Sequence, residues 1–166
     1  MQKVIKNIFF VLVSISVTAS FWVSKELLFP FVTTKAFVFR IAIEAALPCY
    51  VYLLISNKQL RPNLRNPLSL AVLAFLVINI ISSFSGVALI RSLFGNFERM
   101  GGAFYIGHLV LLYFYVVCFG QMSGKYMERF LKVMLFVASV VTINGIFGWL
   151  NATWGLTSAA GFAFPT

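Results

Sequence analysis

The sequence predicts an all-α protein, a polytopic transmembrane helix bundle with about five spans present. Hydrophobic residues make up 61% of its 166 residues and charged residues only 10%, and the mean hydropathy is +0.96. A water-soluble domain of this length could not bury so much apolar surface. Uncharged runs also recur at the length of about 20 residues that a bilayer-spanning helix requires. We therefore expect a single transmembrane region over residues 1–166, with no soluble domain and no internal repeat.

The first span is expected at about residues 7–23. Lys3 and Lys6 precede it, a layout that cleavable signal peptides share. The apolar stretch is long for a signal peptide, and Trp22 stands at its end as interfacial anchors do. We interpret this segment as a retained signal-anchor.

Four more spans are expected at about residues 36–56, 67–84, 102–121 and 131–150. A basic loop separates the second span from the third, and a charged loop separates the fourth from the fifth. These loops contain Lys58, Arg61 and Arg65, and then Lys125, Glu128, Arg129 and Lys132. The charged loops interrupt the hydrophobic runs and so set the boundaries of the spans.

Positive residues are unevenly divided between alternate loops. If the N-terminus is cytoplasmic, eight lie inside: Lys3, Lys6, Lys58, Arg61, Arg65, Lys125, Arg129 and Lys132. Five then lie outside or just within the membrane: Lys25, Lys35, Arg40, Arg91 and Arg99. Because cytoplasmic loops carry an excess of Lys and Arg, this count predicts a cytoplasmic N-terminus.

The net charge of +9 would suggest a nucleic-acid partner in a soluble protein. Here the positive residues lie mainly in short loops between spans, where they orient the chain and contact anionic lipid headgroups. No basic helix interleaved with aromatic residues is present. We expect membrane lipids as partners and no nucleic acid.

Composition also argues against a metal or cofactor site. Aspartate is absent, there are four glutamates, and His108 is the single histidine. Sites built on paired carboxylates or several histidines are therefore not expected. Cys49 and Cys118 both fall in apolar runs, which favours two buried thiols over a disulfide.

Two ionisable residues interrupt the second span. Arg40 and Glu44 are four residues apart, so they lie on one face of a helix at membrane depth. One interpretation is an intrahelical ion pair that braces the bundle. The other is an outward cavity in which Arg40 meets an anionic ligand and Glu44 orients it.

A charged island, residues 87–101, lies between two runs of 25 residues without a charged side chain, Asn66–Ile90 and Met100–Gly124. The island contains the charged residues Arg91, Glu98 and Arg99. At helical spacing Ile90, Phe94 and Phe97 share a face, whereas the polar residues Arg91, Asn96 and Arg99 fall mostly elsewhere. This pattern predicts an amphipathic segment in the outer interface. Its arginines either touch lipid phosphates or capture a phosphorylated lipid substrate. Gly95, Gly101 and Gly102 permit tight turns or close backbone approach.

His108 lies about two turns below the outer end of the fourth span. A lone histidine on an apolar helix is more often a hydrogen-bonded packing residue than a catalyst. Both readings remain open from the sequence.

Two segments resemble the bacterial O-antigen ligase and O-antigen polymerase-like membrane glycosyltransferases. Phe29–Glu44 reads FPFVTTKAFVFRIAIE, similar to the Pro-Phe-x-Thr-x-Lys stretch that leads into an Arg and a Glu in that family. Arg91–Gly102 reads RSLFGNFERMGG and resembles the family's Gly-x-Phe/Tyr-Glu-Arg-Met segment. His108 falls where similar sequences tend to have histidine. The resemblance covers about residues 29–112.

The resemblance implies an inner-membrane, metal-independent enzyme that transfers a glycan from undecaprenyl diphosphate to lipid A-core, another glycan or a protein. The family's catalytic arginines and histidine lie on later spans and in an external loop, so no catalytic residue carries over to this chain. We expect an N-terminal portion of such a protein, inactive alone, with the C-terminal part of the fold missing. Its expected substrate-binding residues, for a lipid diphosphate or glycan, are Arg40, Glu44, Arg91, Glu98, Arg99 and His108. The alternative is a small membrane transporter or assembly subunit that binds an anionic lipid or solute.

Overall fold

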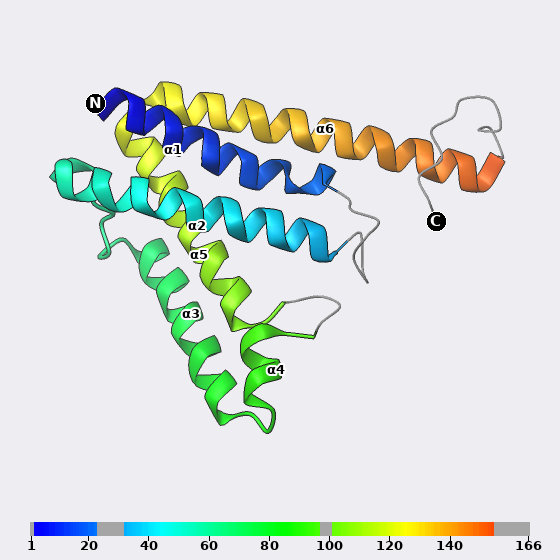
Figure 1. The fold of residues 1–166 in the computed structure, drawn as a ribbon, viewed down its shortest axis with the longest axis horizontal. Coiled ribbons are helices and arrows are strands. Elements are labelled where there is room, and N and C mark those ends of the chain that lie inside the picture. The colour runs from blue at the N-terminus through cyan, green and yellow to red at the C-terminus, as the bar shows by residue number, and fades with distance from the viewer. Residues whose placement is uncertain (1, 23–31, 97–100, 155–166) are drawn as a thin grey trace.

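The computed structural model describes residues 2–22, 32–96 and 101–154, and these are almost entirely helical (Figure 1). The elements are α1 (Gln2–Val17), η1 (Thr18–Phe21), α2 (Thr33–Ser56), η2 (Lys58–Leu60), α3 (Pro67–Ser85), α4 (Leu89–Phe94), α5 (Ala103–Met122) and α6 (Gly124–Trp154). No strand occurs in these ranges. The predicted all-α class is confirmed.

Five of the helical segments are long and apolar enough to cross a membrane: α1 with η1, α2, α3, α5 and α6. They coincide in order with the five predicted spans. The remaining helix, the short α4, falls in the predicted interfacial segment 87–101. The chain is therefore a multi-pass helical protein of membrane type.

Two helices begin before the spans predicted for them. Helix α1 begins at Gln2 rather than near residue 7, and α6 begins at Gly124 rather than near residue 131. Lys132 consequently lies on a helix and bonds Glu128 one turn earlier at 2.6 Å, instead of standing in a loop. Hydropathy marks the part of a helix that lipid can surround, whereas backbone hydrogen bonding continues through charged residues whose side chains reach water.

Local sequence signals explain the start of α3. The side chain of Asn66 accepts a hydrogen bond from the backbone N–H of Leu68 at 3.2 Å, which caps the helix. Pro67 follows at the first helical position, where its missing N–H costs nothing. The basic loop therefore ends at a residue pair that is suited to begin a helix.

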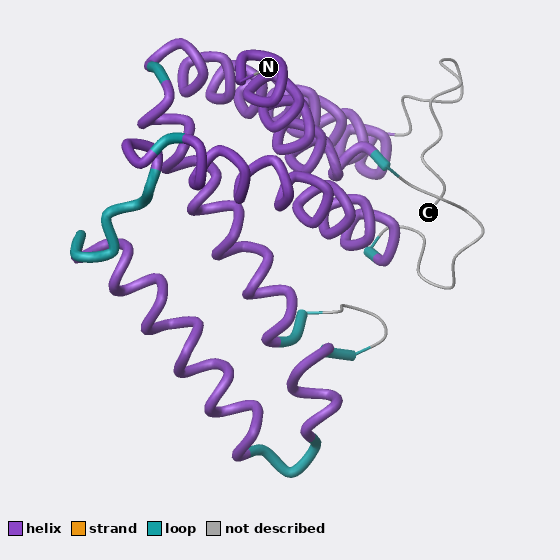
Figure 2. Tube along the Cα trace, turned by 60° about the vertical axis from the view of Figure 1, so that its left-hand side comes forward, coloured by secondary structure: helices purple, strands orange, loops and turns teal. Residues whose placement is uncertain are grey.

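Helices α1, α2 and α6 lie side by side, and α3 and α5 diverge from them toward the α4 end of the molecule (Figures 1 and 2). Helix α5 touches α2, α3, α4 and α6 and so joins the two groups. Most of the outer surface of α3 and α6 is apolar and exposed, as lipid-facing helices require.

The core lies where α1, α2 and α5 meet. Phe9 packs its ring against Tyr50, Tyr115 and Phe119, with centroid separations of 5.9, 5.1 and 5.2 Å. The hydroxyl of Tyr115 donates to the carbonyl oxygen of Ile43 at 3.0 Å. This contact and the aromatic packing fix α5 against the middle of α2, which is the junction that positions the candidate site.

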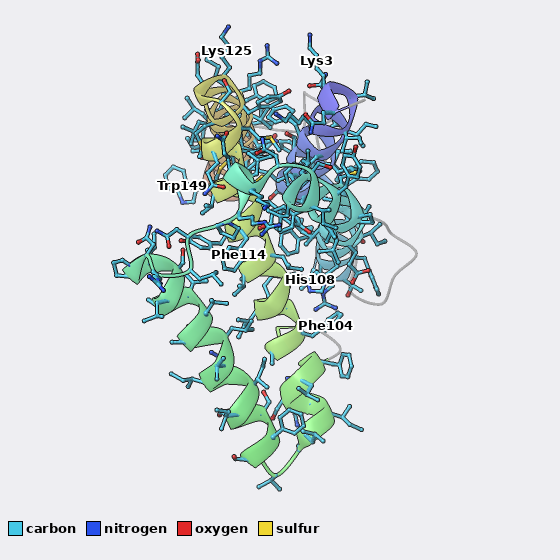
Figure 3. The ribbon with its side chains drawn as sticks, turned by 90° about the vertical axis from the view of Figure 1, so that its left-hand side faces the viewer. Lys3, Phe104, His108, Phe114, Lys125 and Trp149 are labelled. Carbon is cyan, nitrogen blue, oxygen red and sulfur yellow. The ribbon has the colours of Figure 1, made fainter. Side chains whose placement is uncertain are left out.

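The segments that carry the positive residues counted as cytoplasmic contact one another at one end of the fold. Tyr126 at the start of α6 donates to Asn7 on α1 at 2.9 Å, and Gln121 at the end of α5 donates to the carbonyl of Arg61 at 3.3 Å. Lys3 and Lys125 lie at the same end in Figure 3. The opposite end carries α4 and the beginning of α5.

Candidate functional site

A cleft of about 950 Å³ lies between the first half of α2 and the α4 segment. Arg40 lines it from α2, and Arg91 and Asn96 line it from α4 and the residues after it. Most of the remaining wall is apolar and includes Ile90 and Phe94. Two arginines that are distant in sequence thus face one cavity, as the interpretation of Arg40 as a ligand-binding residue requires.

Arg40 is held against aromatic rings of α5. Its guanidinium carbon lies 5.5 Å from the ring centroid of Phe104 and 5.8 Å from that of Tyr105. A cation over an aromatic face is attracted by the ring quadrupole and keeps its charge. The rings therefore orient the guanidinium at the edge of the cleft.

Arg91 is oriented by its own segment. Its Nε–H donates to the side-chain oxygen of Asn96, which lies just beyond the end of α4. The chain turns there at Gly95, whose φ of 82° lies in the region that favours glycine. The prediction that glycines permit a tight turn in this segment is confirmed at Gly95.

Gly102 serves a different purpose. A Cβ atom at this position would overlap the carbonyl oxygen of Leu93 and the backbone nitrogen of Gly95. The backbone before α5 therefore passes directly against the end of α4, as the close-approach prediction anticipated. At Gly101 no atom of the described residues lies within 4 Å of the corresponding position, whereas at Gly102 the overlap leaves no room for a side chain.

Glu44 and His108 form a contact between α2 and α5. Nε2 of His108 lies 3.0 Å from Oε1 of Glu44, and Nδ1 donates to the carbonyl oxygen of Phe104 at 2.8 Å. The side chain of His108 is 6% exposed and that of Glu44 is 57% exposed. Phe104 packs edge-on against the imidazole at a centroid distance of 4.7 Å (both labelled in Figure 3).

Arg40, Phe104, His108 and Glu44 therefore form a continuous chain of contacts, which we call the α2–α5 clasp. Arg40 covers Phe104, Phe104 packs on His108, and His108 bonds Glu44. Glu44 in turn interacts electrostatically with Arg40, one turn earlier on the same helix. The clasp links the charged edge of the cleft to the interface between the two helices.

A second, almost wholly apolar pocket of about 440 Å³ lies among α3, α4 and α5. Leu76 and Ile80 line it from α3, and Phe104 and His108 from α5. Phe94 lines both this pocket and the cleft. The two hollows thus adjoin at one aromatic side chain.

The structure brings together four of the six predicted site residues. Arg40 and Arg91 share the cleft, and Glu44 and His108 share a hydrogen bond. The other two, Glu98 and Arg99, lie outside the described residues, as does Phe97 of the predicted apolar face.

Two residues of the site were missed by sequence reasoning. Phe104 stands one helical turn before His108, and that spacing is a signal that could have linked them. Asn96 was noticed only as a polar residue of the island, because its bond to Arg91 depends on the turn at Gly95.

Within residues 2–22, 32–96 and 101–154, no group of three or more His, Cys, Asp or Glu side chains could hold a metal ion. Both cysteines are free thiols, and Cys118 is buried. What the described site offers chemically is arginine charge beside apolar surface.

Comparison with known proteins gives no match to a family model, a curated protein or a solved structure. The fold and the cleft themselves define the class: a multi-pass helical membrane protein with two arginines facing a largely apolar hollow.

Proposed function

We propose that the cleft between α2 and α4 binds the phosphate or diphosphate headgroup of a polyprenyl-linked glycan, in an O-antigen ligase-like glycosyltransferase. The observation that carries the proposal is that Arg40 and Arg91, from separate elements, line one cleft. Arginine's planar fork suits phosphate oxygens, and it keeps its charge in apolar surroundings.

The apolar lining supports a lipid rather than a free anion. The pocket among α3, α4 and α5 adjoins the cleft at Phe94 and is almost without polar surface. A ligand with a charged head and a hydrocarbon chain matches this arrangement, with the head at the arginines and the first isoprenyl units along the apolar wall.

The two segments that resemble the O-antigen ligase-like family meet at this site. The first ends at Arg40 and Glu44, and the second supplies Arg91 and Asn96. The family supplies the rest of the proposal: an inner membrane, an undecaprenyl diphosphate donor, and a lipid A-core, glycan or protein acceptor. The cytoplasmic N-terminus follows from the count of positive residues. Catalytic residues are not assigned within this chain.

The binding test uses the purified protein in lipid nanodiscs with undecaprenyl diphosphate as the probe. We expect Arg40→Gln and Arg91→Gln each to raise the Kd about tenfold to a hundredfold, because a hydrogen bond to a charged group contributes about 1.5–3 kcal/mol. Lys3→Gln, which removes one exposed positive charge at the opposite end, serves as the matched control. Equal Kd values for all four proteins would overturn the proposal.

A second probe separates the proposal from the alternative of a transporter or assembly subunit, which the same arginines motivate. Inorganic pyrophosphate carries the headgroup chemistry without the lipid chain. We expect it to compete only weakly with undecaprenyl diphosphate, because the apolar pocket contributes nothing to its binding. Tight pyrophosphate binding together with its uptake into proteoliposomes would instead establish a solute transporter.

A further inference from the structure

We propose that Glu44 and His108 form a proton-binding site that joins α2 to α5 within the membrane-spanning region. The argument starts from Nδ1 of His108, which lies 2.8 Å from the carbonyl oxygen of Phe104. A carbonyl oxygen only accepts hydrogen bonds, so Nδ1 carries the donated proton. A neutral imidazole has a single N–H, and none then remains for Nε2.

Nε2 nevertheless lies 3.0 Å from Oε1 of Glu44. An unprotonated nitrogen facing an ionised carboxylate would place two acceptors against each other. One additional proton resolves the conflict, either on the imidazole, which gives an ion pair, or on the carboxyl group, which then donates to Nε2. In both arrangements the pair has taken up one proton from water and has no net charge.

The position of the pair within a membrane-spanning helix favours binding of this proton. Glu44 lies near the middle of α2, one of the five helices apolar enough to span a membrane. A lone carboxylate at such a depth costs several kcal/mol, and a neutral pair lowers that cost. The imidazole is almost fully buried, whereas the carboxylate is 57% exposed.

The ionisable groups around the pair come from three helices. Arg40 lies one turn away on α2, Tyr105 lies on α5, and Arg91 faces Arg40 across the cleft from α4. Helix α3 has no ionisable side chain. Lys3 of α1 and Lys125 at the start of α6 lie at the opposite end of the fold (Figure 3).

The shared proton also sets the charge beside the cleft. While it is bound, Glu44 is neutralised by protonation or by the imidazolium, and Arg40 presents its charge to the cleft. When it is released, a full negative charge stands one turn from Arg40, where it attracts the guanidinium and repels an anionic ligand. This consequence, unlike the proton site itself, rests on the proposed function.

The proton site is tested by ¹⁵N NMR on histidine-labelled protein in nanodiscs, because His108 is the only histidine in the sequence. In the wild type we expect a protonated Nδ1 throughout and one step in the Nε2 signal as rising pH removes the shared proton. Glu44→Gln should lose this step over the same pH range, because its amide N–H can donate to Nε2 without an added proton. Glu128→Gln, the same change at the exposed ion pair of α6, should keep it.

Two results would overturn the proton site. One is an identical Nε2 response in the wild type and Glu44→Gln. The other is visible in the wild type alone, and so does not depend on any variant folding: a neutral imidazole that carries its single proton on Nε2 and none on Nδ1.

The link to the cleft is tested separately with undecaprenyl diphosphate. As the pH rises through the range of the Nε2 step, we expect the wild-type Kd to increase. The Kd of Glu44→Gln should increase less. Titration of the ligand itself affects both proteins equally, so the difference between them reports the shared proton. Parallel pH profiles would refute the link while leaving the proton site standing. No binding by the wild type at any pH would instead refute the proposed function.

Discussion

Arg40 illustrates how a charged residue is accommodated in a membrane-type helix. It is half-buried, covers two aromatic rings of α5, and lies one turn from a carboxylate. Each contact lowers the cost of the charge without neutralising it permanently. The residue is thereby held at the edge of the cleft as a cation.

At the same scale, removing the hydroxyl group of Tyr115 tests how α5 is held against α2. Tyr115→Phe removes its 3.0 Å hydrogen bond to the carbonyl of Ile43 and keeps the ring. We expect the free energy of unfolding to fall by about 0.5–1.5 kcal/mol, the usual net value of such a bond. Thermal unfolding in detergent measures it, with Tyr52→Phe at an exposed position of α2 as control. An unchanged midpoint for Tyr115→Phe would show that ring packing alone holds the two helices together.

The sequence was sufficient to identify the ionisable residues of the site but not all of the residues that they contact. Arg40 and Glu44 were paired through their helical spacing, and His108 was left between packing and function. The structure gives His108 both a backbone acceptor and Glu44 as partners. Spacing along one helix is readable from a sequence, whereas a contact between residues 64 apart depends on how two helices cross.

At the scale of elements, α4 and its two flanking glycines shape the cleft. Gly95 has φ 82° and ψ −177°, a conformation available almost only to glycine. Gly102 brings the start of α5 against the backbone of Leu93. The short helix is therefore positioned by backbone constraints more than by burial, since none of its residues is buried.

Alanine at these glycines should displace α4. We expect Gly95→Ala to cost about 1–3 kcal/mol of strain, and Gly102→Ala to force the two backbone segments apart. Both should weaken undecaprenyl diphosphate binding, because Arg91 and Asn96 move with the segment. Gly101→Ala is the matched control, since no atom in the described part of the chain lies within 4 Å of the added methyl group. Equal binding by all three variants would contradict this role for the turn.

Hydropathy was a better guide to the middle of each element than to its ends. The third span was predicted within one residue of α3, whose start carries a capping asparagine and a proline. Helices α1 and α6 begin before the spans predicted from hydropathy, because charged residues that are not apolar continue each helix at its start. The short α4 was expected as an amphipathic segment, and its helical part proved to be only Leu89–Phe94.

At the scale of the whole molecule, the two ends of the bundle differ in chemistry. One end carries Lys3 and Lys125 (Figure 3), and the carbonyl of Arg61 accepts from Gln121 at the end of α5 that leads to Lys125; the cleft lies at the other end. Because positive residues are retained on the cytoplasmic side, the arrangement predicts that the cleft opens outward.

Cysteine labelling in intact cells tests this orientation. In a background with Cys49 and Cys118 replaced by alanine, Ile90→Cys should react with a membrane-impermeant maleimide added outside. Lys125→Cys should react only after the membrane is permeabilised. Both positions are exposed in the structure, so access depends on the side of the membrane. Labelling of both from the same side would contradict the five-span topology.

Local composition was sufficient to predict the all-α membrane class and the number and order of the helices apolar enough to span a membrane. The physical reason is that a lipid environment selects apolar segments about as long as the bilayer is thick. Tertiary structure decided which charges meet: Arg40 with Arg91 across one cleft, and Glu44 with His108 across two helices. Those pairings depend on where α5 crosses α2 and on the turn at Gly95, which are set by the packing of aromatic side chains and by backbone geometry rather than by any single stretch of sequence.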